Sequence, residues 1–314
     1  MSGRVSAWAW RGVQTGEAWG QARPAGWRDR ASAVTGLAAL AVVTIMAAGE
    51  RSTTTRTEPR PSGPLSAVGR DVMLGAYGGA SYTHPSVVTI RNPGRTDLTV
   101  QGFGWDGQPF KSPVYYGVRT LAWPAGARWG TMLDFTHAKA IARAGDTASF
   151  SGTLEGKSVA SKARIGDVFS HLEFSHGHNI VTLNGLLGLG TFWSRIRPYA
   201  GLGAGVSLPH TEIGFRSQNG RTYEYQYAGV VGQALAGLEV RLDTASVFFE
   251  YKFSYAPYEV PVSGVVNGWL LLTDLWRQLR AWGAGEQPPG GTLRTTLITQ
   301  HGIAGVLVRV GRTR

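Results

Sequence analysis

Residues 197–212 read R-P-Y-A-G-L-G-A-G-V-S-L-P-H-T-E and alternate strictly between two kinds of side chain. Apolar residues occupy one set of alternate positions: Ala200, Leu202, Ala204, Val206 and Leu208. Tyr199 and Ser207 share the other set with Gly201, Gly203 and Gly205. Period two indicates a β-strand with two unlike faces. Glycine weakens an ordinary strand, but it suits the crowded inner wall of a small barrel. The stretch therefore predicts one strand of a membrane β-barrel that ends at Pro209, with His210 and Glu212 at its mouth.

Seven further segments alternate in the same way. With the first, in chain order, they are 71–80, 115–123, 129–137, 179–189, 197–208, 225–242, 246–255 and 299–310. The connections after the second, fourth and sixth segments are short, and those after the odd-numbered segments are long. An up-and-down barrel gives this pattern when one end carries short periplasmic turns and the other faces the exterior. The predicted fold is all-β, an eight-stranded antiparallel up-and-down transmembrane β-barrel in the outer membrane.

Segment 246–255 indicates which face is which. Phe249, Tyr251 and Phe253 share one face, whereas Glu250 and Lys252 share the other. We therefore expect the aromatic face to contact lipid and the charged face to line the lumen. The same parity places these polar residues inside: Arg119, Asp134, Asn184, Gln233, Glu239, Arg241 and Arg309. An unpaired charge in a narrow lumen costs free energy, so we expect these residues to form ion pairs. The ion pairs either serve only to fill the lumen of the barrel or include functional groups.

Composition agrees with this class. The 314 residues are 43% hydrophobic and only 16% charged, with 44 glycines and 11 tryptophans, which suits many strands with aromatic residues at lipid interfaces. The formal net charge is +11, but no basic helix or basic motif interleaved with aromatic residues is present. This excludes nucleic acid as the expected partner and favours an anionic membrane surface. We expect a monomer.

The amino-terminal region has its own organisation. Residues 32–49 are apolar and uncharged, follow several arginines and end on small residues, which is typical of a secretory signal. An uncleaved inner-membrane helix is the alternative. We therefore divide the chain into a signal-type segment at 1–49, a disordered linker at 50–70, the barrel at 71–310 and a tail at 311–314.

Six short stretches carry a more specific pattern. They are W-D-G…P-F at 105–110, P-V-Y-Y-G-V-R at 113–119, L-D-F-T-H-A-K at 133–139, F…G…N at 174–179, P-Y…P-H at 198–210 and F-E-Y-K-F-S-Y at 249–255. Together they resemble the lipid A oxidase family of outer-membrane barrels, and the likeness covers most of residues 73–310. The resemblance implies that lipid A of lipopolysaccharide is the partner. It also implies oxidation of the proximal glucosamine to an aminogluconate unit by molecular oxygen, with dependence on a divalent metal.

The histidines suggest where such chemistry would occur. All seven lie towards the predicted long-loop end: His84, His137, His171, His176, His178, His210 and His301. An oxidase that uses oxygen needs a redox metal or an organic cofactor, and the chain lacks the glycine fingerprint of dinucleotide binding. Imidazole and carboxylate ligands suit iron, manganese or copper. We therefore expect a divalent or redox metal ion, with O2 as co-substrate, and the candidate ligands are His137, His178, His210 and Glu212. The candidate acid–base or positioning residues are Asp134, Lys139 and Glu250. Solvated histidines at the rim are the alternative.

The last long loop contains the sequence N-G-W-L-L-L-T-D-L-W-R-Q-L-R-A-W at 267–282. Its Trp and Leu residues recur at helical spacing, which predicts an amphipathic helix that either lies at the membrane interface or packs as a lid on neighbouring loops. Arginine grips phosphate with two hydrogen bonds. The candidate substrate-binding residues are therefore Trp276, Arg277 and Arg280, with Arg143 from the second long loop.

Three functions remain open at this stage. The first is an oxygen-dependent lipid A oxidase. The second is a non-enzymatic structural or adhesin barrel of the OmpA type. The third is a lipid A deacylase, which would need a Ser/His/acid arrangement on the outer face.

Overall fold

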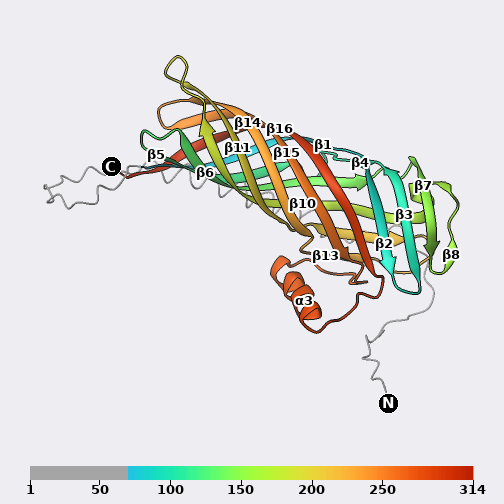
Figure 1. The fold of residues 1–314 in the computed structure, drawn as a ribbon. Helices are drawn as coiled ribbons and strands as arrows, with labels where there is room; N and C mark the ends of the chain where they lie inside the picture. The colour runs from blue at the N-terminus through green and yellow to red at the C-terminus, as the bar shows by residue number, and fades with distance from the viewer. Residues whose placement is uncertain (1–69, 314) are drawn as a thin grey trace.

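The computed structural model describes residues 70–313, in which eight antiparallel strands close into a ring (Figure 1). In order around the ring they are β1 (Arg70–Thr83), β5 (Tyr116–Pro124), β6 (Trp129–Ala142), β10 (Phe169–Gly188), β11 (Ile196–Ser207), β14 (Gly229–Arg241), β15 (Ala245–Pro261) and β16 (Thr292–Thr313). β16 pairs back onto β1, which completes the ring. Each of the eight segments predicted from sequence alternation therefore overlaps one strand of the ring, although residues 226–228 of segment 225–242 are not strand. The expected signal-type segment lies outside the described residues, as does the linker up to residue 69, and β16 continues to Thr313 where a tail was expected.

The ring has the sidedness that the alternation predicts. Leu202 is 73% exposed on the outside, whereas Tyr199 on the same strand is buried. The inward glycines leave room for larger neighbours. A Cβ atom on Gly203 would lie 2.1 Å from Oδ1 of Asn184, so the glycine makes space for this luminal amide.

A network of buried charges fills the ring. Arg119 donates from Nε to Asp134 Oδ1 over 3.0 Å and from its two terminal nitrogens to Glu250 over 3.0 and 2.9 Å. Lys252 donates to the other oxygen of Asp134 over 3.0 Å, and Tyr199 donates to Glu250 over 2.6 Å. We call these five residues the luminal network. The predicted pairing is confirmed for Arg119, Asp134, Glu250 and Lys252, and it satisfies groups that would otherwise be costly to bury.

Beyond the luminal network, several ring strands continue into an outer extension. Its additional strands are β2 (Ser86–Asn92), β3 (Thr96–Phe103), β4 (Trp105–Asp106), β7 (Thr147–Leu154), β8 (Lys157–Ser158), β9 (Lys162–Arg164), β12 (His210–Phe215) and β13 (Thr222–Tyr225). β2 pairs with β16 and leads to β3 and β7, whereas β12 pairs with β10 and β13. The region 87–105, which lies in the long connection between the first two predicted segments, is thus largely the β2–β3 hairpin.

The extension is built around an apolar core. On the inward face of β15, Lys252 and Ser254 are followed by Ala256, Tyr258 and Val260, all buried. The last three belong to a large cluster of buried apolar residues drawn from most strands of the extension. The same strand face therefore lines a polar lumen at one end and a hydrophobic core at the other.

Two helices complete the described part of the chain. The short α2 (Ile165–Val168) precedes β10, and α3 (Leu271–Gly283) confirms the helix predicted in the last long loop. Figure 1 shows α3 beside the strands, next to β13. Within residues 70–313, no helix is both long and apolar enough to span a membrane.

Candidate functional site on the outer wall

Strand alternation brings polar residues together on the outside of the extension. Ala138 and Ala140 of β6, Leu172 and Phe174 of β10, and Ile213 and Phe215 of β12 are buried, and nearly all of them belong to the apolar core. The residues between them consequently point to the opposite, outer face, where His171 is exposed and Glu173 is half-buried, whereas the other four are buried beneath neighbouring residues. These outward-pointing residues are His137, Lys139, His171, Glu173, His210 and Glu212. We call this surface of β6, β10, β12 and β13 the outer wall.

Three outer-wall residues form a compact group of potential metal ligands. Glu173 of β10 stands opposite Glu212 of β12 in the strand register. Nδ1 of His171 lies 3.5 Å from an oxygen of each carboxylate, and one ligand atom from each residue lies within 4.8 Å of the others. We call this set the His–Glu–Glu group. Among the described residues, it is the one set of three or more such side chains with this spacing.

A neighbouring arginine neutralises part of the negative charge of this group. Arg221 forms an ion pair with Glu212. Burial raises the pKa of Glu212, and the charge of Glu173 raises it further, against the opposing effect of Arg221. The hydrogen bond to Glu173 raises the pKa of His171. Two carboxylates facing one guanidinium leave a net negative charge when the imidazole is neutral, which suits a divalent cation.

Aromatic rings surround His210 beside this group. The ring centroid of His210 lies 4.4 Å from that of Tyr223, 4.7 Å from Tyr225 and 5.5 Å from Trp269. Its Nε2 donates to the carbonyl oxygen of Gly268 over 2.9 Å, so the remaining ring nitrogen, Nδ1, is an acceptor in the neutral imidazole. Nδ1 is buried and has no hydrogen-bond partner among the described residues. Burial lowers the pKa of His210.

His176 connects the aromatic rings to the carboxylates. Its ring centroid lies 5.1 Å from that of His210, and burial, together with the charge of His210, lowers the pKa of His176 to about 4. Ser175 contacts Nδ1 of His176 over 3.4 Å and also hydrogen-bonds Glu173. In a hydrolase triad the histidine lies between the serine and the acid, whereas here the serine lies between the other two. The geometry therefore gives no support to the deacylase alternative.

The four predicted metal ligands do not form a single group. His137, His210 and Glu212 share the outer wall, but His178 faces the interior, where it hydrogen-bonds Tyr258. His137 is held by Asn179 over 2.8 Å, and its Nε2 is buried without a hydrogen-bond partner in residues 70–313. Only Glu212 of the four belongs to the His–Glu–Glu group, so the structure does not bring the predicted ligands together as one set. The sequence carried a signal for the other two members of the group, since His171 and Glu173 alternate with the apolar Leu172 and Phe174.

The predicted acid–base residues are separated by the wall of the ring. Asp134 and Glu250 belong to the luminal network, and their side chains are fully buried. Lys139 lies on the outer wall and donates to the carbonyl of Lys111 over 2.8 Å. The three cannot act together on one substrate, because the carboxylates are committed to Arg119 and Lys252 inside the ring.

The predicted substrate-binding residues also differ in availability. Arg277 forms ion pairs with Glu224 and Asp274, so it is committed to the protein. Trp276 and Arg280 are exposed on α3, and Arg143 is exposed just beyond β6. These three can meet a ligand without first breaking an ion pair that the structure shows.

No protein-family model matches the chain, and no curated protein sequence matches it. A functional assignment therefore depends on the geometry of the outer wall.

Proposed function

We propose that the protein is an outer-membrane β-barrel that oxidises lipid A at the outer wall, with a divalent metal held by the His–Glu–Glu group. The observation that carries the proposal is the change from polar to apolar side chains along the outward face of β10. This face begins with His171 and Glu173 and continues to the exposed Leu183 and Leu187. A lipid standing beside the wall could place its sugar head group at the polar end and its acyl chains along the apolar end.

The membrane setting is supported by the surface of the ring. Large apolar side chains point outward from its strands, and we call them the apolar belt: Leu133, Leu183, Leu187, Leu202, Val230, Leu238, Phe249, Tyr251 and Phe253. Polar and charged residues are buried inside the same ring. Apolar-out and polar-in alternation is typical of strands that cross a bilayer. In this proposal the strands leave the membrane near His137, Asn179, Tyr255 and Thr299, and the extension stands outside the cell.

The residues present fit a divalent ion by their chemistry. One imidazole and two carboxylates are a donor set that manganese or iron accepts. A bound redox metal would supply the reaction with molecular oxygen that oxidation of the sugar requires. Arg221 would orient Glu212 through their ion pair, and Glu173 would orient His171.

Other outer-wall residues would bind the head group. Trp269 is partly exposed and offers an aromatic face beside the site, suited to the apolar face of a sugar ring. The exposed guanidinium groups of Arg143 and Arg280 would bind the phosphates of lipid A. The buried ring of Tyr223 beside His210 would keep bulk water from one side of the site.

Mass spectrometry of lipid A from aerobic cells that make the protein tests the proposal. We expect the proximal glucosamine to gain one oxygen atom in cells with the wild-type protein. His171→Ala and Glu173→Gln should abolish the change, whereas Glu259→Gln, in an exposed ion pair with Arg294, should retain it. Unmodified lipid A in the wild type would refute the oxidase and favour a structural or adhesin barrel. Loss of acyl chains would favour the deacylase.

A further inference from the structure

Helix α3 is attached to the protein by its polar side. Asp274 and Gln278 are its buried residues. Asp274 accepts a hydrogen bond from the backbone N–H of Tyr225 over 3.2 Å. Gln278 accepts one from the N–H of Tyr227 over 2.7 Å and donates to its carbonyl over 2.9 Å. Polar side chains of the helix therefore hydrogen-bond the backbone of the last residue of β13 and of the segment just after it.

The apolar side of α3 faces outward. Leu272, Trp276 and Leu279 are 81%, 59% and 55% exposed. With 3.6 residues per turn, these three lie on the side of the helix opposite Asp274 and Gln278. A helix that packs on a globular core shows the reverse arrangement, with its apolar stripe inward. The sequence left open a lid that packs on neighbouring loops, and α3 does contact β13, but it does so through its polar side and leaves the apolar stripe uncovered.

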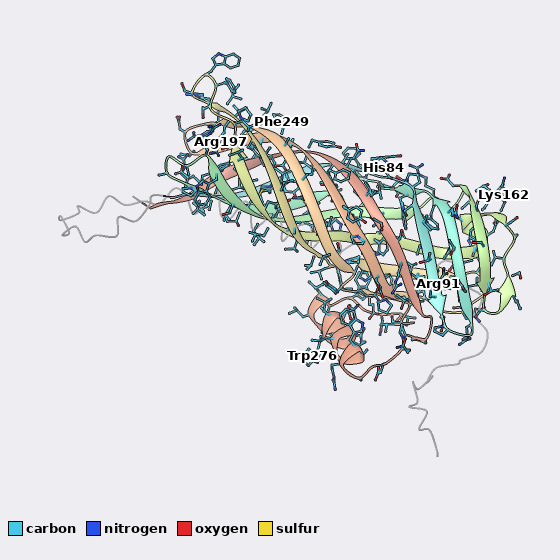
Figure 2. All side chains as sticks on the ribbon, viewed as in Figure 1. His84, Arg91, Lys162, Arg197, Phe249 and Trp276 are labelled. Carbon is cyan, nitrogen blue, oxygen red and sulfur yellow. The ribbon has the colours of Figure 1, made fainter. Side chains whose placement is uncertain are left out.

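We infer that α3 lies in the outer leaflet of the membrane, with Leu272, Trp276 and Leu279 among the acyl chains. The inference deepens the proposed function and rests on its membrane setting. Continuity of the surface supports it: α3 is attached to β13, which pairs with β12, which pairs with β10, whose outward face leads directly into the apolar belt. Figure 2 shows Trp276 on α3 at the side of the strands and Phe249 on the outside of the ring.

The composition of the helix fits an interfacial position. Trp269 precedes α3 and Trp282 lies in its last turn, and tryptophan prefers the boundary between acyl chains and head groups. Arg280 is exposed beside the apolar stripe, where it can meet lipid phosphates while the stripe is immersed. An immersed α3 would hold Gly268 and Trp269, and hence one side of the outer-wall site, at the height of the lipid head groups.

Site-specific labelling tests this position directly, because the chain contains no cysteine. Leu272→Cys would carry an environment-sensitive fluorophore in the full-length protein, reconstituted into phosphatidylcholine vesicles with brominated acyl chains. Tyr251→Cys in the apolar belt serves as the lipid-exposed reference. Lys162→Cys, exposed on β9 of the extension, serves as the water-exposed reference. All three side chains are exposed, so substitution removes little packing.

We expect bromine to quench most of the emission at Leu272 and Tyr251 and to leave the emission at Lys162 unchanged. Quenching at Tyr251 but not at Leu272 would overturn the inference. Cross-linking between Leu272→Cys copies without quenching would assign the apolar stripe to a second copy and would also overturn it. No quenching at Tyr251 would remove the membrane setting and the inference together. Quenching at Leu272 in a protein that leaves lipid A unmodified would uphold the helix position and refute only the oxidase.

Discussion

His210 donates its Nε2 hydrogen to the carbonyl oxygen of Gly268 over 2.9 Å, and this bond joins β12 to the segment that leads into α3. Gly268 is also bonded through its N–H to the carbonyl of Tyr223 over 2.8 Å. The outer-wall site and the helix are therefore mechanically connected through one glycine. A change at either end should be detectable at the other.

Replacing His210 with phenylalanine should loosen this connection. The variant keeps an aromatic ring among Tyr223 and Tyr225 but loses a hydrogen bond worth about 1 kcal/mol, so amide exchange in residues 263–270 should accelerate roughly fivefold. Hydrogen exchange followed by mass spectrometry measures this. His84→Phe, which alters a histidine bonded to Gln300 elsewhere, should leave the segment unchanged. Equal exchange in the His210 variant and the wild type would contradict the coupling.

Removing one carboxylate from the His–Glu–Glu group should reduce metal binding. Glu173→Gln and Glu212→Gln each lose a charged oxygen donor, and we expect bound manganese to fall by at least about tenfold at a limiting concentration. Elemental analysis of the purified barrel after equilibration and gel filtration gives the content. Glu259→Gln keeps the fold of the extension and provides the matched control. A wild-type barrel that retains no metal would rule out this site.

Adding a methyl group at Gly117 should destabilise the ring. A Cβ atom there would lie 2.0 Å from Cζ of Tyr77, whose hydroxyl accepts a hydrogen bond from Lys252 over 2.8 Å. Gly117→Ala should therefore lower the free energy of unfolding by about 1–3 kcal/mol. Gly232→Ala, where nothing lies within 4 Å of the added atom, should change it by less than about 0.5 kcal/mol. Denaturant unfolding in detergent micelles compares the two, and equal stabilities would contradict the tight packing at Tyr77.

Neutralising Arg119 should be more costly than neutralising an exposed arginine. Arg119→Met leaves Asp134 and Glu250 buried with only Lys252 as a compensating cation, and the expected loss is about 3–5 kcal/mol. Arg294→Met breaks an exposed pair with Glu259 and should cost about 0–1 kcal/mol. Denaturant unfolding in detergent micelles compares the stability losses of the two variants. A small loss for Arg119→Met would show that the luminal network contributes little to stability.

Acidification should loosen β10 around His176, where the register of this strand with β6 shifts between Phe174 and His178. Burial lowers the pKa of this histidine to about 4 in the folded protein, against an unperturbed value of about 6.5, so the unfolded segment binds more protons between these values. Stability therefore rises with pH across this window and falls as pH drops from 6.5 towards 4. His137, Lys139 and His210 act in the same direction as burial, whereas Glu173 opposes it.

Amide exchange over residues 174–178 at pH 7 and pH 5, corrected for intrinsic rates, measures this loosening. His176→Phe should show a smaller pH dependence than the wild type, because phenylalanine cannot be protonated. The same pH dependence in both proteins would exclude His176 as the responsible group.

Much of the ring could be predicted from the sequence because alternation is a local signal. Each of the eight segments carries its own period of two, and parity then correctly placed Glu250 inside and Phe249 outside. The outer extension was missed for a physical reason. At Ala256 the inward face of β15 changes from polar to apolar without a change of parity, so the predicted strand ended at Tyr255 whereas the real one continues to Pro261.

The site was predictable only in part. Lys139, His210 and Glu212 could be assigned to the correct end of the barrel, but parity cannot reveal which strands of an extension become neighbours. The pairing of Glu173 with Glu212 depends on the return of β12 alongside β10, which involves no short-range pattern. Asp134 and Glu250 were predicted as acid–base or positioning residues, and the structure places both of them in ion pairs with Arg119.

The filled ring also constrains how the molecule can work. Arg119, Asp134, Glu250 and Lys252 occupy its interior, and the apolar core stands in line beyond them. The interior of the ring therefore offers no path along its axis for solutes or ions. A planar bilayer that contains the protein should show no ionic current under an applied voltage. Under the proposed function, a substrate would therefore have to reach the outer wall from the side, from the plane of the membrane.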